Sequence, residues 1–118
     1  MTAVEDWDTV TVSLDGGESL ASTPNTTRVE LVSRIGDTLT ISVDGGSTGA
    51  EPAQYTMTVD RYSTALDDWM EYKRVTTTTK MTHEFEAPAW RVRVNITNTS
   101  GGSASYRAEA VSETYSRA

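Results

Sequence analysis

Apolar and polar residues alternate with a period of two along most of this chain, and no window carries a helical stripe. Alternation places successive side chains on opposite faces of a strand, so each such segment predicts a β-strand with one buried face. The inward positions of these strands are Val10, Val12 and Leu14; Val29 and Leu31; Leu39, Ile41 and Val43; Tyr55, Met57 and Val59; Met81, His83 and Phe85; Trp90, Val92, Val94 and Ile96; and Ala104, Tyr106 and Ala108. Residues 69–75 predict a further strand with two partly apolar faces, and residues 18–22 predict a short one.

Turn residues separate these segments every 8–12 residues or so, which is typical of all-β folds. Asp-Gly-Gly occurs at 15–17 and at 44–46, Ser-Gly-Gly-Ser occurs at 100–103, and residues 63–68 form a polar turn. We therefore predict an all-β fold, an antiparallel β-sandwich of about eight or nine short strands, either jelly-roll or immunoglobulin-like. Its length predicts a single domain over residues 1–118, with polar residues 1–8 and 112–118 as extended arms.

Composition excludes several classes of protein. The 118 residues include no cysteine, which removes disulfides and thiolate metal sites. The first residues lack the basic and apolar regions of a signal peptide, and no apolar run is long enough to span a membrane. We therefore expect no membrane partner and assembly in the cytoplasm.

The chain is acidic, with 17 Asp and Glu against 10 Lys and Arg and a formal net charge of −7. Lys73 and Lys80 are its two lysines, and threonine is abundant. This balance resembles that of haloarchaeal proteins, whose carboxylates hold water and ions in brine; an acidic mesophilic β-protein is the alternative, because strands favour threonine and valine. Under either interpretation no nucleic-acid partner is expected, since such binding needs a basic face.

No set of residues predicts catalysis. His83 is the single histidine, and its place in an alternating strand predicts a position at the rim of the core. Asp67 and Asp68 are adjacent in a turn, where aspartate forms local hydrogen bonds, whereas a glycosidase needs two carboxyls across a cleft. A small hydrolase built on these three residues is therefore disfavoured, and the glycine pairs lack the lysine and helix of a phosphate loop. We predict a protein that is not an enzyme and has no cofactor.

Metal binding has only weak candidates. Asp15, Asp44, Asp67 and Asp68 offer oxygen ligands of the kind that calcium prefers. The Asp-Gly-Gly turns lack the alternating acidic ligands of a calcium loop, so we predict no metal site.

The aromatic residues leave two interpretations open. Tyr55, Trp90 and Tyr106 share apolar strand faces and predict core or interface positions. Trp69 and Tyr72 are less clearly inward, so with Asp67 and Asp68 they are candidates for an interface or a ligand contact, including a sugar platform. All three asparagines, Asn25, Asn95 and Asn98, begin glycosylation sequons, which chance explains in a chain so rich in serine and threonine.

The second half carries a resemblance. It reads Tyr-Thr-Met-Thr-Val-Asp-Arg-Tyr-Ser at 55–63, Asp-Asp-Trp at 67–69, Trp-Arg-Val-Arg-Val-Asn at 90–95, and Ser-Gly-Gly-Ser-Ala-Ser-Tyr-Arg at 100–107. This order resembles small β-sandwich proteins encoded among the structural genes of tailed viruses, over residues 54–111. Tyr62 interrupts the usual Arg-Ser step, and Asp68 replaces a usual glycine. Some secreted and carbohydrate-binding sandwiches share the Arg-Val-Arg-Val and Ser-Gly-Gly-Ser features.

The resemblance implies a non-enzymatic virion protein, most simply a capsid decoration or turret protein of a haloarchaeal virus. It would pack as a homo-oligomer, a trimer or a pentamer, beside other virion proteins such as a major capsid protein. Its contact surfaces would be residues 45–53, residues 63–68 and the two termini. A carbohydrate-binding or adhesion module and a tail or baseplate component are the alternatives.

Overall fold

The computed structural model describes residues 2–17, 19, 29–34, 36–47, 49–88 and 90–115, with side chains from residue 6 to residue 113 within these ranges. The described residues form eight strands and no helix, which confirms the all-β prediction. The strands are β1 (Thr2–Leu14), β2 (Val29–Val32), β3 (Thr38–Asp44), β4 (Tyr55–Ser63), β5 (Asp68–Thr77), β6 (Met81–Glu86), β7 (Arg91–Asn98) and β8 (Ala104–Tyr115). No helix that could cross a membrane occurs in this part of the chain.

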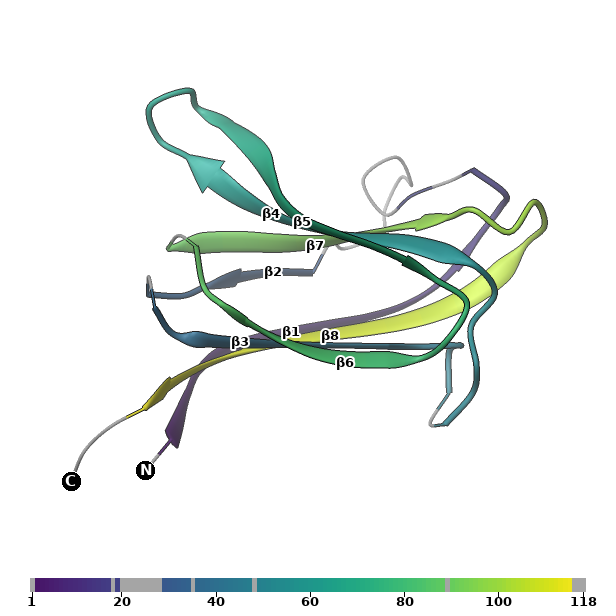
Figure 1. Cartoon of the computed structure of the whole chain (residues 1–118), viewed down its shortest axis with the longest axis horizontal. Helices are drawn as coiled ribbons and strands as arrows, with labels where there is room; N and C mark the ends of the chain where they lie inside the picture. The colour runs from purple at the N-terminus through teal and green to yellow at the C-terminus, as the bar shows by residue number, and fades with distance from the viewer. Residues whose placement is uncertain are drawn as a thin grey trace.

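Two four-stranded sheets pack face to face (Figure 1). The terminal sheet has the order β1-β8-β3-β6, and the hairpin sheet has the order β2-β7-β4-β5; every pairing is antiparallel. The first strand pairs with the last, β2 with β7, β3 with β6 and β4 with β5, as in one long hairpin rolled into two layers. This is the jelly-roll topology, so the immunoglobulin-like alternative does not apply.

The core lies between the sheets and consists of the alternating apolar positions of both. Fully buried side chains include Leu39 and Ile41 from the terminal sheet and Val59 and Val94 from the hairpin sheet. At one end of the core the rings of Tyr55 and Tyr106 meet edge to face, with centroids 5.7 Å apart. Their hydroxyls donate hydrogen bonds to the carbonyls of Thr79 and Gln54, at 3.1 and 3.0 Å, so both polar tips are satisfied.

Two residues expected to face the core are exposed instead. His83 does lie opposite Ile41 on the inward face of β6. However, β6 is an edge strand, so the ring is exposed and stacks on Phe85 with centroids 6.0 Å apart. Trp90 precedes β7 and is 48% exposed. His83 thus faces inward at the margin of the core as predicted but is not buried, whereas the inward prediction was wrong for Trp90; alternation continues to the sheet margin, but the opposing sheet does not.

The chain ends are paired strand rather than separate segments. Residues 2–8 belong to β1 and residues 112–115 to β8, and Thr2 opposes Tyr115 in the register of these strands. The first and last described residues, Thr2 and Tyr115, therefore lie side by side (Figure 1). Residue 1 and residues 116–118 fall outside the described residues. Of the short strand predicted at 18–22, only Ser19 is described; it forms an isolated bridge with Thr97.

Candidate functional site

The outer face of the hairpin sheet carries side chains in rows that cross its strands. In the row nearest the β4–β5 turn, Arg91 opposes Val32 on β2, and Tyr62 opposes Trp69 on β5. In the next row, Glu30, Arg93, Asp60 and Glu71 oppose one another in turn. Because side chains opposite each other on one sheet face lie within contact distance, each row acts as a unit.

Three aromatic rings and two guanidinium groups meet in and beside these two rows. We call Tyr62, Trp69, Trp90, Arg91 and Arg93 the aromatic–arginine cluster. The guanidinium carbon of Arg91 lies 4.6 Å from the ring centroid of Tyr62, 5.2 Å from that of Trp69 and 5.4 Å from that of Trp90. That of Arg93 lies 4.7 Å from the Trp69 centroid. Tyr62 and Trp69 also meet edge to face, with centroids 5.5 Å apart. These distances fall within the range of cation–π attraction.

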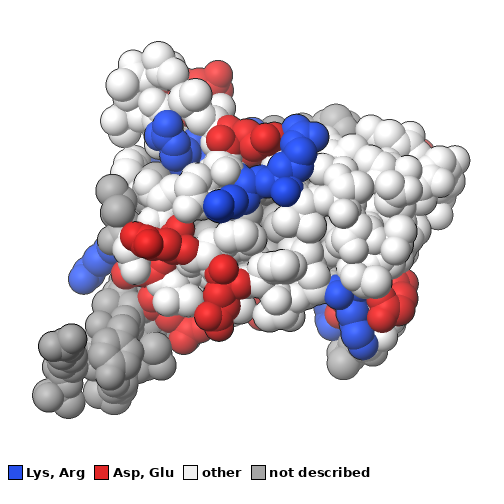
Figure 2. Space-filling view, in the orientation of Figure 1, with Lys and Arg blue, Asp and Glu red and all other residues white. Residues whose placement is uncertain are grey.

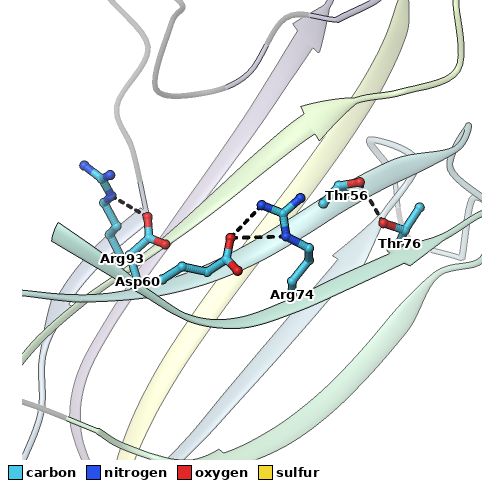
Figure 3. A network of polar contacts seen from close by, with 6 residues as sticks. Thr56, Asp60, Arg74, Thr76 and Arg93 are labelled. Carbon is cyan, nitrogen blue, oxygen red and sulfur yellow. Dashed lines mark hydrogen bonds and ion pairs between the residues drawn. The ribbon is translucent and has the colours of Figure 1, made fainter.

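Two ion pairs fix Arg93, which belongs to the cluster, and Arg74, which lies beside it (Figure 3). The Nε of Arg93 donates to Asp60 at 2.8 Å, and these side chains are only 16% and 10% exposed. Arg74 donates to Glu71 at 2.6 Å on the open surface, and this hydrogen bond lowers the pKa of Glu71. No ion pair involves Arg91 within the described ranges. Its guanidinium is therefore positioned by rings rather than by a carboxylate.

Asp67 and Asp68 shape the β4–β5 turn. Asp67 has a φ of 52°, in the left-handed region that aspartate tolerates, and its carboxylate accepts a hydrogen bond from the Tyr62 hydroxyl. The Asp68 carboxylate accepts from the backbone N–H of Trp69 at 2.7 Å. These bonds hold Tyr62 and Trp69 at the base of the turn, so both aspartates position the cluster.

The four aspartates proposed as cation ligands do not converge. Asp15 accepts from the Ser103 hydroxyl at 2.8 Å, and Asp44 pairs with Arg107. Both lie at the end of the sandwich opposite Asp67 and Asp68. Among the described residues, no group of three acidic or histidine side chains could hold a metal ion.

Trp69 and Tyr72, predicted as interface or ligand contacts, have different surroundings. The Trp69 ring contacts two guanidinium groups and is half-buried, so its faces are not free for a sugar. Tyr72 lies at a β-bulge, where the register shifts between Val59 and Asp60, and the ammonium of Lys73 lies 5.2 Å from its ring centroid. Alternation with Val92 and Val94 places Arg91 and Arg93 on the outward face, but the sequence pattern predicts no role for either arginine.

Exposed apolar side chains gather at one end of the sandwich, which we call the aromatic end. Val32, Leu66 and Trp90 lie there and are 56%, 65% and 48% exposed. Trp7, which is 61% exposed, instead opposes Val111 on the outer face of the terminal sheet. The opposite end, the turn end, holds the loops around residues 15–17, 45–54 and 99–103, and none of its described residues is a large exposed hydrophobic. Figure 2 shows that charges on the visible face gather on the half with the hairpin and termini; the rest is largely uncharged apart from one mixed-charge group.

Of the expected contact surfaces, residues 63–68 and the paired chain ends lie at the aromatic end, and residues 45–53 at the turn end.

One sequon falls inside the fold. Asn98 is fully buried, and its amide nitrogen donates to the carbonyls of Leu14 and Gly102 at 2.8 and 2.6 Å. Its side chain is therefore not available to a glycosylating enzyme. Asn25 lies outside the described residues, and Asn95 lies on the outward face of β7.

The chain is a jelly-roll β-sandwich, and comparison with known proteins defines its class no further. No protein family model matches it, and no curated protein matches its sequence. Among solved structures it is similar to a mitogen derived from Yersinia pseudotuberculosis, with a TM-score of 0.55 and 16% identity over 89% of this chain and 84% of the mitogen. It is also similar to PirA, with a TM-score of 0.54 and 11% identity over 85% of this chain and 90% of that one. A third similar structure is PliG of Aeromonas hydrophila, a periplasmic inhibitor of g-type lysozyme. Its TM-score is 0.54, and its identity is 15% over 92% of this chain and 86% of PliG. At such identities these similarities establish the sandwich fold alone.

Proposed function

We propose that this chain is a non-enzymatic assembly module, and specifically a capsid decoration or turret protein that packs symmetrically on a virus particle. The observation that carries the proposal is the aromatic–arginine cluster, together with the exposed Val32, Leu66 and Trp90 at the same end. The resemblance of residues 54–111 to virion sandwiches and the acidic composition support the viral part. The jelly roll, which occurs in viral capsid and lectin domains, adds a fold-level analogy.

The chemistry of the cluster suits a protein interface. Tryptophan, tyrosine and arginine are the residues that contribute most of the binding energy at interfaces. Association normally costs free energy because flexible side chains become ordered. Here Asp60 already holds Arg93, and three rings already hold Arg91, so this entropy is largely lost before a partner arrives. The aromatic end is therefore preorganised for contact.

The charge of the chain predicts how assembly depends on salt. Acidic side chains surround the aromatic end, among them Glu30, Asp67, Asp68 and Glu86, and like copies repel each other at low ionic strength. The screening length falls to about 3 Å in molar salt, and salting-out ions strengthen apolar burial. We therefore expect the aromatic end to associate in molar salt and to separate in dilute buffer.

Sedimentation velocity at about 0.1 M and about 3 M KCl tests this proposal. We expect a monomer in dilute buffer and a closed trimer or pentamer in strong salt, together with binding to virus particles that carry a major capsid protein. Trp90→Ser and Arg91→Ala should weaken both, whereas Ser47→Ala, at the turn end, should change neither. A strict monomer in both buffers that never binds particles would overturn the proposal. Binding to isolated tails alone would contradict the role on the capsid and support that of a tail component.

A further inference from the structure

The outer face of the terminal sheet has a hollow of about 720 Å³ that the aromatic–arginine cluster does not explain. We call it the terminal-sheet groove. It crosses all four strands, and side chains of Thr9, Ser42, Thr82, Arg107 and Glu109 line it. Its volume is in the range of pockets that hold small ligands.

One cross-strand row supplies most of the hydrogen-bonding groups. Glu109 on β8 opposes Thr9 on β1 and Ser42 on β3, and Ser42 opposes Thr82 on β6. The row therefore places one carboxylate among three hydroxyls. The Ser42 and Thr82 hydroxyls are 3.1 Å apart and share a hydrogen bond, and the Thr9 hydroxyl donates to the Ala108 carbonyl at 3.0 Å. Each hydroxyl keeps further capacity, since it has one donor and two acceptor lone pairs.

The charged groups of the groove differ in what they already bind. Arg107 pairs with Asp44, which fixes its guanidinium, and the Lys80 ammonium reaches the Gly49 carbonyl at 3.4 Å on the rim. The Glu109 side chain is exposed, and no other described residue forms an ion pair or hydrogen bond with its carboxylate. The groove thus offers a strong acceptor at its centre and cationic donors toward the turn end.

We infer that the terminal-sheet groove binds a short neutral oligosaccharide. A sugar presents both donors and acceptors, and hydroxyl-to-carboxylate bonds are among the stronger hydrogen bonds. Glu109 would accept from sugar hydroxyls, while Arg107, Lys80 and the three hydroxyls would bond to the remaining oxygens. The carboxylates of Asp44 and Glu109 balance the cations of Lys80 and Arg107, so the lining has no net formal charge to favour an ionic ligand, and its hydroxyls favour a polar one.

The groove is independent of the assembly surface. It lies on the other sheet and toward the turn end, so a copy held by its aromatic end leaves it open to solvent. A protein built in this way would attach to a particle at one end and bind glycans along one side.

Titration of ¹⁵N-labelled protein with cellohexaose, maltohexaose and mannohexaose, followed by amide chemical shifts, tests the inference; oligogalacturonate serves as the anionic comparison. At least one neutral hexasaccharide should shift the amides of Thr9, Ser42 and Glu109. Glu109→Gln should weaken that binding about tenfold or more, which corresponds to about 1.4 kcal/mol. Glu84→Gln is the matched control, because Glu84 is exposed on β6 but does not line the groove.

Three results would overturn the inference: no shift of these amides by any neutral sugar, undiminished binding by Glu109→Gln, or a preference for oligogalacturonate. Sedimentation of the same samples separates this outcome from that of the assembly proposal. If the protein associates in molar salt but binds no sugar, only the inference about the groove is contradicted. If it binds sugar but does not associate, only the proposal about the aromatic end is contradicted.

Discussion

The carboxylate of Asp6, on β1, accepts a hydrogen bond of 2.8 Å from the backbone N–H of Val32, on β2. Two residues along each strand, Asp8 accepts from the backbone N–H of Glu30 at 3.0 Å. The two strands belong to different sheets, and the other edge of β2 pairs with β7. The aspartates thus take the place of a neighbouring strand and close the seam between the sheets. They also occupy an edge that would otherwise be open to pairing with another chain.

Removing either acceptor should destabilise the protein. Asp6→Ala and Asp8→Ala leave a backbone N–H of β2 without its charged partner, so each should lower the free energy of unfolding by about 1 kcal/mol. Asp6→Asn keeps a carbonyl oxygen and should have a smaller effect. Urea denaturation measures these differences, with Glu84→Ala as an exposed control. Alanine variants as stable as the parent would show that the core alone holds the seam closed.

This seam also shows what the sequence could and could not predict. Alternation identified Leu39 and Ile41 as core because burial on one face of a strand has a period of two. It did not identify the role of Asp6, which depends on β2 lying beside it after a separation of many residues. The burial predicted for Trp90 was wrong for a related reason. Its place in the alternation is correct, but the opposing sheet does not cover it, and the side chain is 48% exposed. The cluster around Arg91 likewise depends on strand order, which local pattern does not encode.

The buried ion pair beside the cluster should contribute more than the exposed one. Asp60→Ala leaves Arg93 unpaired at a largely buried site, and we expect a loss of about 2 kcal/mol in the free energy of unfolding. Glu71→Ala breaks a pair on the open surface and should change stability by no more than the error of the measurement. A double-mutant cycle between Asp60 and Arg93 isolates the pairwise contribution. Equal effects of Asp60→Ala and Glu71→Ala would contradict this assignment.

Asn98 should be essential to the turn end. Its side-chain oxygen accepts from the backbone N–H and the hydroxyl of Ser100 at 2.8 and 2.7 Å, while its nitrogen donates to the Leu14 and Gly102 carbonyls. Asn98→Ala leaves the Leu14 carbonyl unsatisfied at a buried site and removes three part-buried hydrogen bonds, and we expect a loss of about 3 kcal/mol in the free energy of unfolding, measured by thermal or urea denaturation. Asn98→Asp keeps the acceptor but removes the donor and buries a charge, so it should be comparably damaging. Thr99→Ala, at an exposed neighbour, should be tolerated; equal stability of all three variants would refute a structural role for Asn98.

Tyr55 should titrate well above the ordinary range of a tyrosine, and its titration should limit stability at high pH. Burial, reinforced by the nearby Tyr106 and Glu51, raises the pKa of Tyr55 to about 12. The unfolded chain releases this phenolic proton near pH 10, whereas the folded chain retains it, so the free energy of unfolding should fall as the pH rises from about 10 toward 12. Ultraviolet absorbance of the phenolate should show a late step that disappears in Tyr55→Phe and persists in Tyr72→Phe. If the late step survived in Tyr55→Phe, or if stability rose over this interval, the buried ring would not be the group responsible.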